Sequence, residues 1–179
     1  LAPDEVARVG ANSVAVAHCP SSNARLGAGI APIRELLDAG VAVGLGVDGA
    51  ASNEAGELNL ELREALLAAR FRGGADALTV RDALALGTIE GARCLGRANE
   101  IGSLEDGKMA DIALWDLDDV GHAGIDDPIA ALVLGPPRRV HTLLVGGRIV
   151  VDDGRITTVD EEVVARNLVR ECMRLAERR

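Results

Sequence analysis

Aromatic side chains are almost absent from this sequence of 179 residues, which has one tryptophan, one phenylalanine and no tyrosine. Hydrophobic residues nevertheless make up 48% of it. The core must therefore be built from alanine, valine, leucine and isoleucine, whose small side chains let backbone segments approach closely. No apolar run approaches the ~18 residues that a membrane-spanning helix requires, so we predict no membrane span and expect no membrane partner.

Cations and cysteines are also scarce. Lys108 is the only lysine, and 28 acidic residues against 19 basic ones give a net charge of −9. This charge argues against nucleic acid as a partner, because phosphate contacts need clustered cations. The three cysteines are odd in number and far apart, so neither a disulfide framework nor a zinc knuckle follows, and we expect a reduced, cytoplasmic protein. They are Cys19, Cys94 and Cys172.

Histidine is the scarcity that bears most on function. Only His18, His122 and His141 occur, whereas a zinc site normally takes at least three protein ligands. The segment Leu1–Glu5 has neither the basic nor the apolar stretch of a signal peptide, and it lacks an initiator methionine. We therefore expect a chain that forms the last part of a longer enzyme and that is inactive as a fragment.

Two strand-like runs carry polar residues at their carboxyl ends. Ser13–Ala17 is followed by His18, and Val41–Val47 is followed by Asp48, with a predicted helix over Ile33–Ala39 between the two runs. Near-continuous apolar strands in this strand–helix–strand order are typical of a parallel sheet in an α/β fold. Because active sites of such folds are built at the carboxyl ends of the strands, we predict a site there.

Further helices and a second region follow. Apolar residues at helical spacing predict helices over Leu58–Arg70, Val80–Leu86 and Glu90–Leu95. After Gly102 the pattern changes to short strands with glycine turns, and a charged amphipathic helix is predicted over Asp160–Arg179. This indicates a small antiparallel β unit with a terminal helix. The strands are predicted over Ala110–Leu117, Val140–Val145 and Arg148–Val151.

Each candidate site residue has a plain structural interpretation beside the functional one. Asp48 is either a turn-forming aspartate or a carboxylate that binds a metal and moves a proton. His18 is either a core histidine or a functional group, Asn23 a turn residue or a site group, and Arg25 a loop charge or a substrate anchor. The G-x-G-x-x-G spacing of Gly44–Gly49 is a poor dinucleotide fingerprint, because its glycines lie inside the apolar run.

Four segments together resemble the amidohydrolase superfamily, in its branch of cytosine/guanine deaminases and chlorohydrolase-like enzymes. The first matches H-x-P-x-S-N-x-x-L-x-x-G-x-x-P, and the second matches the T/V-D-G-x-x-S-N that follows the eighth strand of the family's barrel. The third is similar to A/G-T-x-x-G-A-x-x-L-G and the fourth to I-G-S-L-E-x-G-K-x-A-D. In order, the segments are His18–Pro32, Val47–Asn53, Gly87–Gly96 and Ile101–Asp111.

The resemblance implies the C-terminal part of a metal-dependent (β/α)₈ TIM barrel plus half of a small composite β-sandwich. Residues 1–101 would hold barrel strands 7 and 8 with the following helices, residues 102–159 the sandwich strands, and residues 160–179 a C-terminal helix. The family's His-x-His pair, its His-x-x-Glu acid and its other metal-binding histidines have no counterpart here. Of the usual ligands, only the eighth-strand aspartate carries over, onto Asp48.

Hydrolytic deamination is the activity that the resemblance implies. Asp48 would be both the metal ligand and the catalytic group. His18, Asn23 and Arg25 would either bind substrate or form hydrogen bonds that orient the metal ligand. The cofactor would be one divalent metal ion, zinc, with iron as the alternative. The partner would be a small purine-like molecule, and the longer enzyme would be a homo-oligomer.

The resemblance narrows the substrate to a small set of heterocycles without selecting one. The C-terminal part most resembles the 8-oxoguanine deaminases, which favours 8-oxoguanine, while guanine, adenosine-type nucleosides and triazines stay open. The other interpretation is a truncated, non-catalytic α/β module that pairs with a partner chain.

Overall fold

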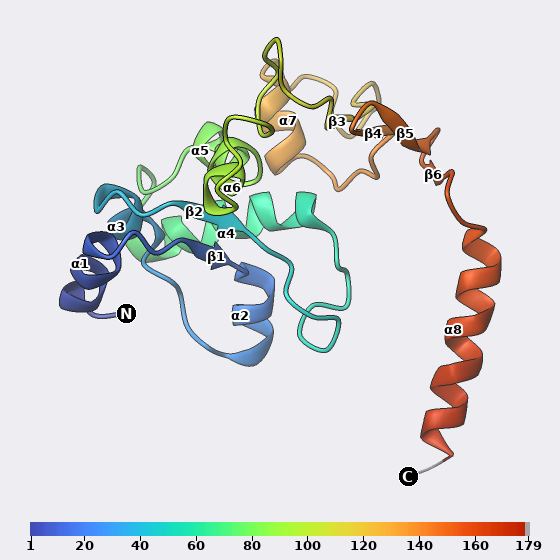
Figure 1. Ribbon diagram of the computed structural model, residues 1–179, viewed down its shortest axis with the longest axis horizontal. Coiled ribbons are helices and arrows are strands. Elements are labelled where there is room, and N and C mark those ends of the chain that lie inside the picture. Colours follow the sequence, from blue (N-terminus) through green and yellow to red (C-terminus); the bar gives the residue numbers. More distant parts are fainter. Residues whose placement is uncertain (178–179) are drawn as a thin grey trace. The chain divides into compact units, whose positions relative to one another are not determined.

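The computed structural model describes residues 1–177, whose helices and strands are drawn in Figure 1. The chain forms two compact units. The first unit comprises Leu1–Lys108 and Leu117–Arg138, and the second comprises Met109–Asp116 and the chain from Arg139 onward. Helices and strands both occur, as expected for an α/β fold. Within residues 1–177, none of the helices combines the length and the apolar character that crossing a membrane takes.

The first unit is built on a pair of short parallel strands, β1 (Val16–His18) and β2 (Val43–Leu45). Val16 lies opposite Val43 and His18 opposite Leu45, so the parallel pairing predicted from the two apolar runs is confirmed. The helices of this unit are α1 (Pro3–Ala11), α2 (Pro20–Leu26), α3 (Ile33–Asp38), α4 (Leu58–Gly73), α5 (Val80–Leu86), α6 (Ile89–Cys94) and α7 (Pro128–Leu134).

Local sequence signals explain where several of these helices begin and end. Thr79 precedes α5 and accepts a hydrogen bond from the backbone N–H of Asp82, whose carboxylate bonds back to Thr79 in a capping box. Helix α2 was not predicted, although Pro20 stands at its first position and Gly27 ends it with a φ of 65°. Helix α7, capped by the side chain of Asp127, was also missed.

The core of the first unit is aliphatic, as the composition requires. Val43, Leu66 and Leu78 are fully buried, whereas Phe71 is 84% exposed. Burying one aliphatic side chain contributes about 2 kcal/mol, so this core is the sum of many small contributions. Its larger members come from β2, from α3, α4 and α5, and from the connection between α4 and α5: Ile33, Leu36, Val43, Leu62, Leu66, Leu78 and Leu86.

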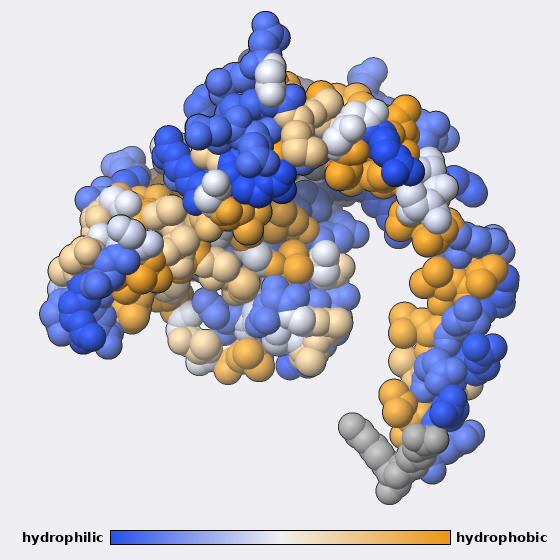
Figure 2. All heavy atoms as spheres, in the orientation of Figure 1, coloured by the Kyte–Doolittle hydropathy of each residue, from blue (hydrophilic) through white to orange (hydrophobic). Residues whose placement is uncertain are grey.

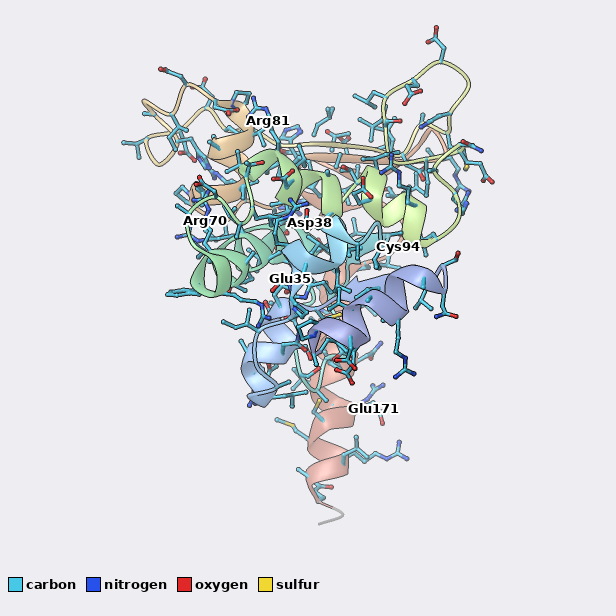
Figure 3. The ribbon with its side chains drawn as sticks, turned by 90° about the vertical axis from the view of Figure 1, so that its left-hand side faces the viewer. Glu35, Asp38, Arg70, Arg81, Cys94 and Glu171 are labelled. Carbon is cyan, nitrogen blue, oxygen red and sulfur yellow. The ribbon has the colours of Figure 1, made fainter. Side chains whose placement is uncertain are left out.

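The close approach of α6 to the sheet depends on Gly44. A methyl group on Gly44 would lie 2.8 Å from the Cα of Gly91 and 3.2 Å from the Sγ of Cys94. The Cys94 thiol, labelled in Figure 3, donates to the carbonyl oxygen of Ala42 at 3.1 Å and to that of Val16 at 3.5 Å. The glycine inside this strand therefore makes room for a helix.

The second unit contains a four-stranded antiparallel sheet. Its strands, in spatial order, are β3 (Ile112–Leu114), β4 (Thr142–Val145), β5 (Arg148–Asp152) and β6 (Arg155–Ile156). Gly146 and Gly147, with φ of 55° and 78°, form the two-residue turn between β4 and β5 and adopt the left-handed backbone that such hairpins favour. Strand β6 was not predicted.

Helix α8 (Glu161–Ala176) follows the sheet of the second unit. The side chain of Asp160 caps it by accepting from the backbone N–H of Val163. The helix predicted over Asp160–Arg179 is confirmed up to Ala176, and its last two residues lie outside the described part of the chain.

An exposed apolar face runs along α8. Val164, Leu168 and Leu175 recur on one side of the helix and are 51%, 63% and 63% exposed. Figure 2 shows apolar residues gathered on one side of α8 and hydrophilic residues on the other. Val163 lies on the hydrophilic side by its helical position. Exposed apolar surface of this kind favours association.

We expect the chain to self-associate through this apolar face of α8. Leu168→Glu should weaken the association, because it would require burying an unpaired carboxylate. Val163→Glu adds the same charge to the opposite side of α8 and should have little effect. Sedimentation velocity over a range of concentrations distinguishes the two variants, and equal behaviour would show that this face is not involved.

Candidate functional site

The carboxyl ends of β1 and β2 bring two polar segments together. The backbone N–H of Gly46 donates to the carbonyl oxygen of His18 at 2.9 Å, which carries the pairing one step beyond the strands. Helix α2 begins directly after β1, and the loop that contains Asp48 follows β2. The predicted site at this edge therefore lies between the start of α2 and the Asp48 loop.

Asp48 is held by two serine hydroxyls, one from each segment. Ser22 Oγ donates to Asp48 Oδ2 at 2.6 Å and Ser52 Oγ donates to the same oxygen at 3.0 Å. The hydrogen bond from Ser22 lowers the pKa of Asp48 most, followed by those from the Gly49 backbone and Ser52. Asp48 is thus an exposed, ionised carboxylate, and neither serine hydroxyl donates to its Oδ1.

The backbone of Asp48 is unusual for a residue with a side chain. Its φ is 62°, in the left-handed region, which aspartate and asparagine tolerate better than most residues. Such a conformation persists only where many contacts with the surrounding structure hold the backbone in place. Asp48 therefore has the left-handed backbone of a turn residue, and its role as a metal ligand and proton acceptor stays a prediction.

A second carboxylate, that of Glu61, binds the residues next to the two serines. Glu61, in the first turn of α4, is 1% exposed. Its Oε2 accepts from the backbone N–H of Ser21 at 3.0 Å, and its Oε1 accepts from Asn53 Nδ2 at 2.9 Å. Sequence reasoning missed Glu61 and both serines. One signal was available: Glu61 stands three residues after Leu58 and four before Ala65, on the apolar face of the helix.

Arg25 lies at the surface on α2. Its guanidinium forms an ion pair with Glu54 at 3.2 Å, and the two side chains are 59% and 65% exposed. An exposed pair of this kind contributes about 0–1 kcal/mol. It joins α2 to the loop that follows Asp48, and a contact between Arg25 and substrate stays a prediction.

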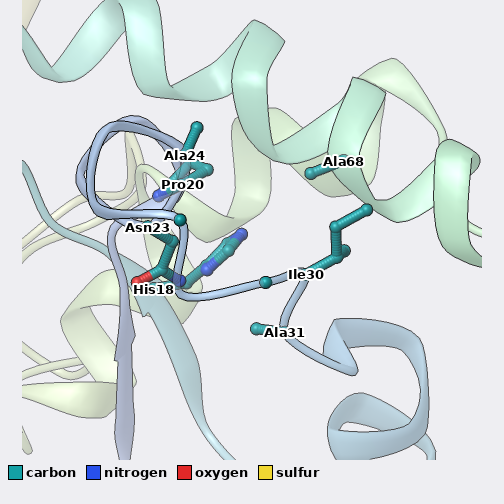
Figure 4. A pocket seen from close by; sticks show the side chains of 9 residues that line it. His18, Pro20, Asn23, Ala24, Ile30, Ala31 and Ala68 are labelled. Atoms are coloured by element: carbon teal, nitrogen blue, oxygen red, sulfur yellow. The ribbon is translucent and has the colours of Figure 1, made fainter.

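His18 and Asn23 line a different part of this region. His18 is 3% exposed, and within the described chain neither of its ring nitrogens has a hydrogen-bond partner. Burial lowers the pKa of His18 to about 4, so the ring is neutral at physiological pH. Both residues border a cavity of about 300 Å³ that Ile30 and Ala68 also line (Figure 4). The structure brings His18 and Asn23 together, but the hydrogen bonds of Asp48 go to the serines.

Metal binding requires more donors than this site supplies. Among residues 1–177, no group of three or more His, Cys, Asp or Glu side chains is placed to hold a metal ion. Asp48 fits the part of one ligand, because its carboxylate is ionised, exposed and oriented by hydrogen bonds. Further ligands would have to come from outside the described residues.

The sequence profile of the Amidohydrolase family matches residues 1–150. Since this is most of the chain, the protein belongs to the amidohydrolase family, and the resemblance of the four segments is confirmed.

Particular relatives agree with the deaminase and chlorohydrolase branch of this family. An 8-oxoguanine deaminase from Pseudomonas aeruginosa is 45% identical over 157 residues, which cover 88% of this chain and 35% of that protein. An adenosine deaminase from Xanthomonas campestris with bound zinc has a TM-score of 0.94 at 29% identity, over 99% of this chain and 41% of that one. An atrazine chlorohydrolase from Arthrobacter aurescens complexed with zinc has a TM-score of 0.88 at 37% identity, over 95% and 38%. The chain thus spans between 35% and 41% of the lengths of these relatives.

The burial of His18 predicts a specific pH dependence of stability. Unfolded His18 binds a proton below its ordinary pKa of 6.5, whereas folded His18 stays neutral down to about 4. The unfolded state therefore binds more protons in this window, and the free energy of unfolding should fall by about 3 kcal/mol as the pH drops from 6.5 to 4. Above pH 6.5, where His18 is neutral in both the folded and the unfolded state, this loss of stability is absent.

His18→Gln removes this titration while keeping a polar side chain of similar size. Urea unfolding of wild type and variant between pH 4 and pH 8 measures the effect, and the stability of the variant relative to wild type should rise as the solution is acidified. Parallel pH curves for the two proteins would show that folded His18 titrates as an exposed histidine does.

Proposed function

We propose that this chain is part of a metal-dependent amidohydrolase that deaminates a purine-type heterocycle by hydrolysis, with 8-oxoguanine as the favoured substrate. The observation that carries the proposal is Asp48, an ionised carboxylate fixed by two serine hydroxyls at the carboxyl end of a parallel strand pair. The 45% identity to an 8-oxoguanine deaminase supports the substrate.

The proposal assigns the two units to parts of the family's architecture. β1 and β2 would be strands 7 and 8 of a (β/α)₈ barrel within residues 1–101, and the antiparallel strands would be half of a β-sandwich within residues 102–159. Residues 160–179 would be the C-terminal helix. The parallel register of β1 and β2, and the TM-score of 0.94 against a zinc-containing adenosine deaminase, support this assignment.

Asp48 would carry out two tasks in the reaction. A divalent metal ion, for which zinc is proposed, would lower the pKa of a bound water from ~16 toward 7. Asp48 would hold the ion through Oδ1, accept the proton of the attacking water and deliver it to the departing ammonia. Ser22 and Ser52 would keep the carboxylate oriented through Oδ2 during both tasks.

The remaining proposed roles are supporting ones. His18 and Asn23 would shape the cavity beside α2, and Arg25 would approach the substrate from the surface. The partner would be a small molecule, and the whole enzyme would be a cytoplasmic homo-oligomer. The second candidate, a non-catalytic module that pairs with another chain, is favoured by one observation: residues 1–177 hold no group of three potential ligands.

Asp48→Asn in the full-length enzyme tests the main proposal. Asparagine tolerates the same left-handed backbone but lacks the charge that binds the metal and the base that accepts the proton. Ammonia release should fall by at least about 10²–10⁴-fold, and bound metal should be lost. Assays with 8-oxoguanine, guanine, adenosine and a triazine, together with metal analysis, measure both effects. Normal turnover and metal content would reduce Asp48 to a turn residue.

The 179-residue chain by itself should release no ammonia and should hold zinc weakly, because one carboxylate stands in place of a set of at least three ligands. Dialysis against buffer followed by metal analysis checks this expectation. Stoichiometric zinc after dialysis would mean that these residues alone complete a site, which would contradict the proposed dependence on further ligands.

A further inference from the structure

The two carboxylates of this region are connected through adjacent residues. Ser22 binds Asp48, and its neighbour Ser21 donates its backbone N–H to Glu61. Ser52 also binds Asp48, and its neighbour Asn53 donates its side-chain amide to Glu61. Both serines that orient Asp48 are therefore next in sequence to a residue that Glu61 holds.

Glu61 is placed to hold these two segments rigidly. It is 1% exposed, while Ser22 is 2% and Asn53 7% exposed, so its hydrogen bonds are shielded from competing water. Each carboxylate oxygen serves a different segment: Oε2 the start of α2 and Oε1 the loop after β2. Helix α4, 16 residues long and packed in the core, supplies the fixed support.

The chemical identity of Glu61 matters as much as its position. Both groups that face it are donors, and only a carboxylate offers two acceptor oxygens in this geometry. Burying a carboxylate costs free energy unless hydrogen bonds compensate for the lost water. Its position in the first turn of α4 also favours the negative charge. A glutamine of the same size could accept only one of the two bonds.

We infer that Glu61 is a positioning residue for Asp48, acting through Ser21–Ser22 on one side and Ser52–Asn53 on the other. It touches neither substrate nor metal in this scheme. Its effect on turnover rests on the proposed function, whereas its effect on the order of the two segments does not. An error of a few tenths of an ångström in the Asp48 carboxylate would be expected to lower kcat more than it changes KM.

Swapping the donor and the acceptor between Asn53 and Glu61 tests the inference in the full-length enzyme. Glu61→Gln leaves one donor without an acceptor, and Asn53→Asp places two carboxylates against each other. The double variant, Glu61→Gln with Asn53→Asp, restores both bonds, because the glutamine amide can donate to the new aspartate while its oxygen accepts from Ser21. Glu64→Gln, at an exposed position on the same helix, is the matched control.

Two measurements are made on all four variants. The first is hydrogen exchange in peptides that span Pro20–Leu26 and Asp48–Asn53. The second is the steady-state kinetics of ammonia release. We expect each single variant of the pair to exchange faster in both peptides and to lose about 10- to 100-fold in kcat, with KM changed little. The double variant should recover both properties, and Glu64→Gln should behave as wild type.

The two readouts separate the inference from the proposed function. Absence of ammonia release from the wild type would refute the proposed function, and hydrogen exchange would still decide the role of Glu61. Unchanged exchange and kcat in Glu61→Gln would overturn the inference. A double variant that behaves no better than the single variants would also overturn it. This includes the case in which Glu61→Gln fails to fold and adding Asn53→Asp does not restore folding.

Discussion

The parallel pairing of β1 with β2 is the interaction on which the rest of the site depends. It sets the ends of two strands side by side, so that α2 starts next to the loop that carries Asp48. The pairing is covered on one side by α6, which approaches closely because Gly44 has no side chain. On the other side, Val43 lies in the aliphatic core. A chain almost without aromatic rings can pack its layers this closely because its contacts are made by small side chains.

Two carboxylates in contrasting surroundings give the site its character. Asp48 is exposed and ionised, and it keeps one oxygen clear of the serine hydroxyls, as a metal ligand or proton acceptor requires. Glu61 is buried and uses both oxygens to bind protein donors. Asp48 thus has an oxygen that the proposed reaction could use, whereas both oxygens of Glu61 accept hydrogen bonds from the protein. Through the serines and their neighbours, hydrogen bonds connect Glu61 of α4 with the turn at Asp48.

The sequence predicted the parts of this arrangement that follow from local patterns. Apolar periodicity found both strands of the pair and the helices α3 to α6, and the four segments identified the family. Periodicity could not reveal that the run beginning at Pro20 is a helix, because its serines and asparagine give no apolar face. Nor could it reveal that Glu61 meets Ser21 and Asn53, since that contact joins residues 40 and 8 positions apart through the tertiary fold. The polar contacts that orient Asp48 required the structure.

The proposed function requires Asp48 to bind a divalent metal ion through Oδ1, the oxygen to which neither serine hydroxyl donates. Anomalous diffraction from crystals of the full-length enzyme, recorded at the absorption edge of the bound metal, tests this most directly. A metal ion should lie about 2.0–2.2 Å from Asp48 Oδ1, with Ser22 and Ser52 donating to Oδ2. A metal ion bound elsewhere, or an Asp48 carboxylate turned away from it, would show that Asp48 is not the ligand.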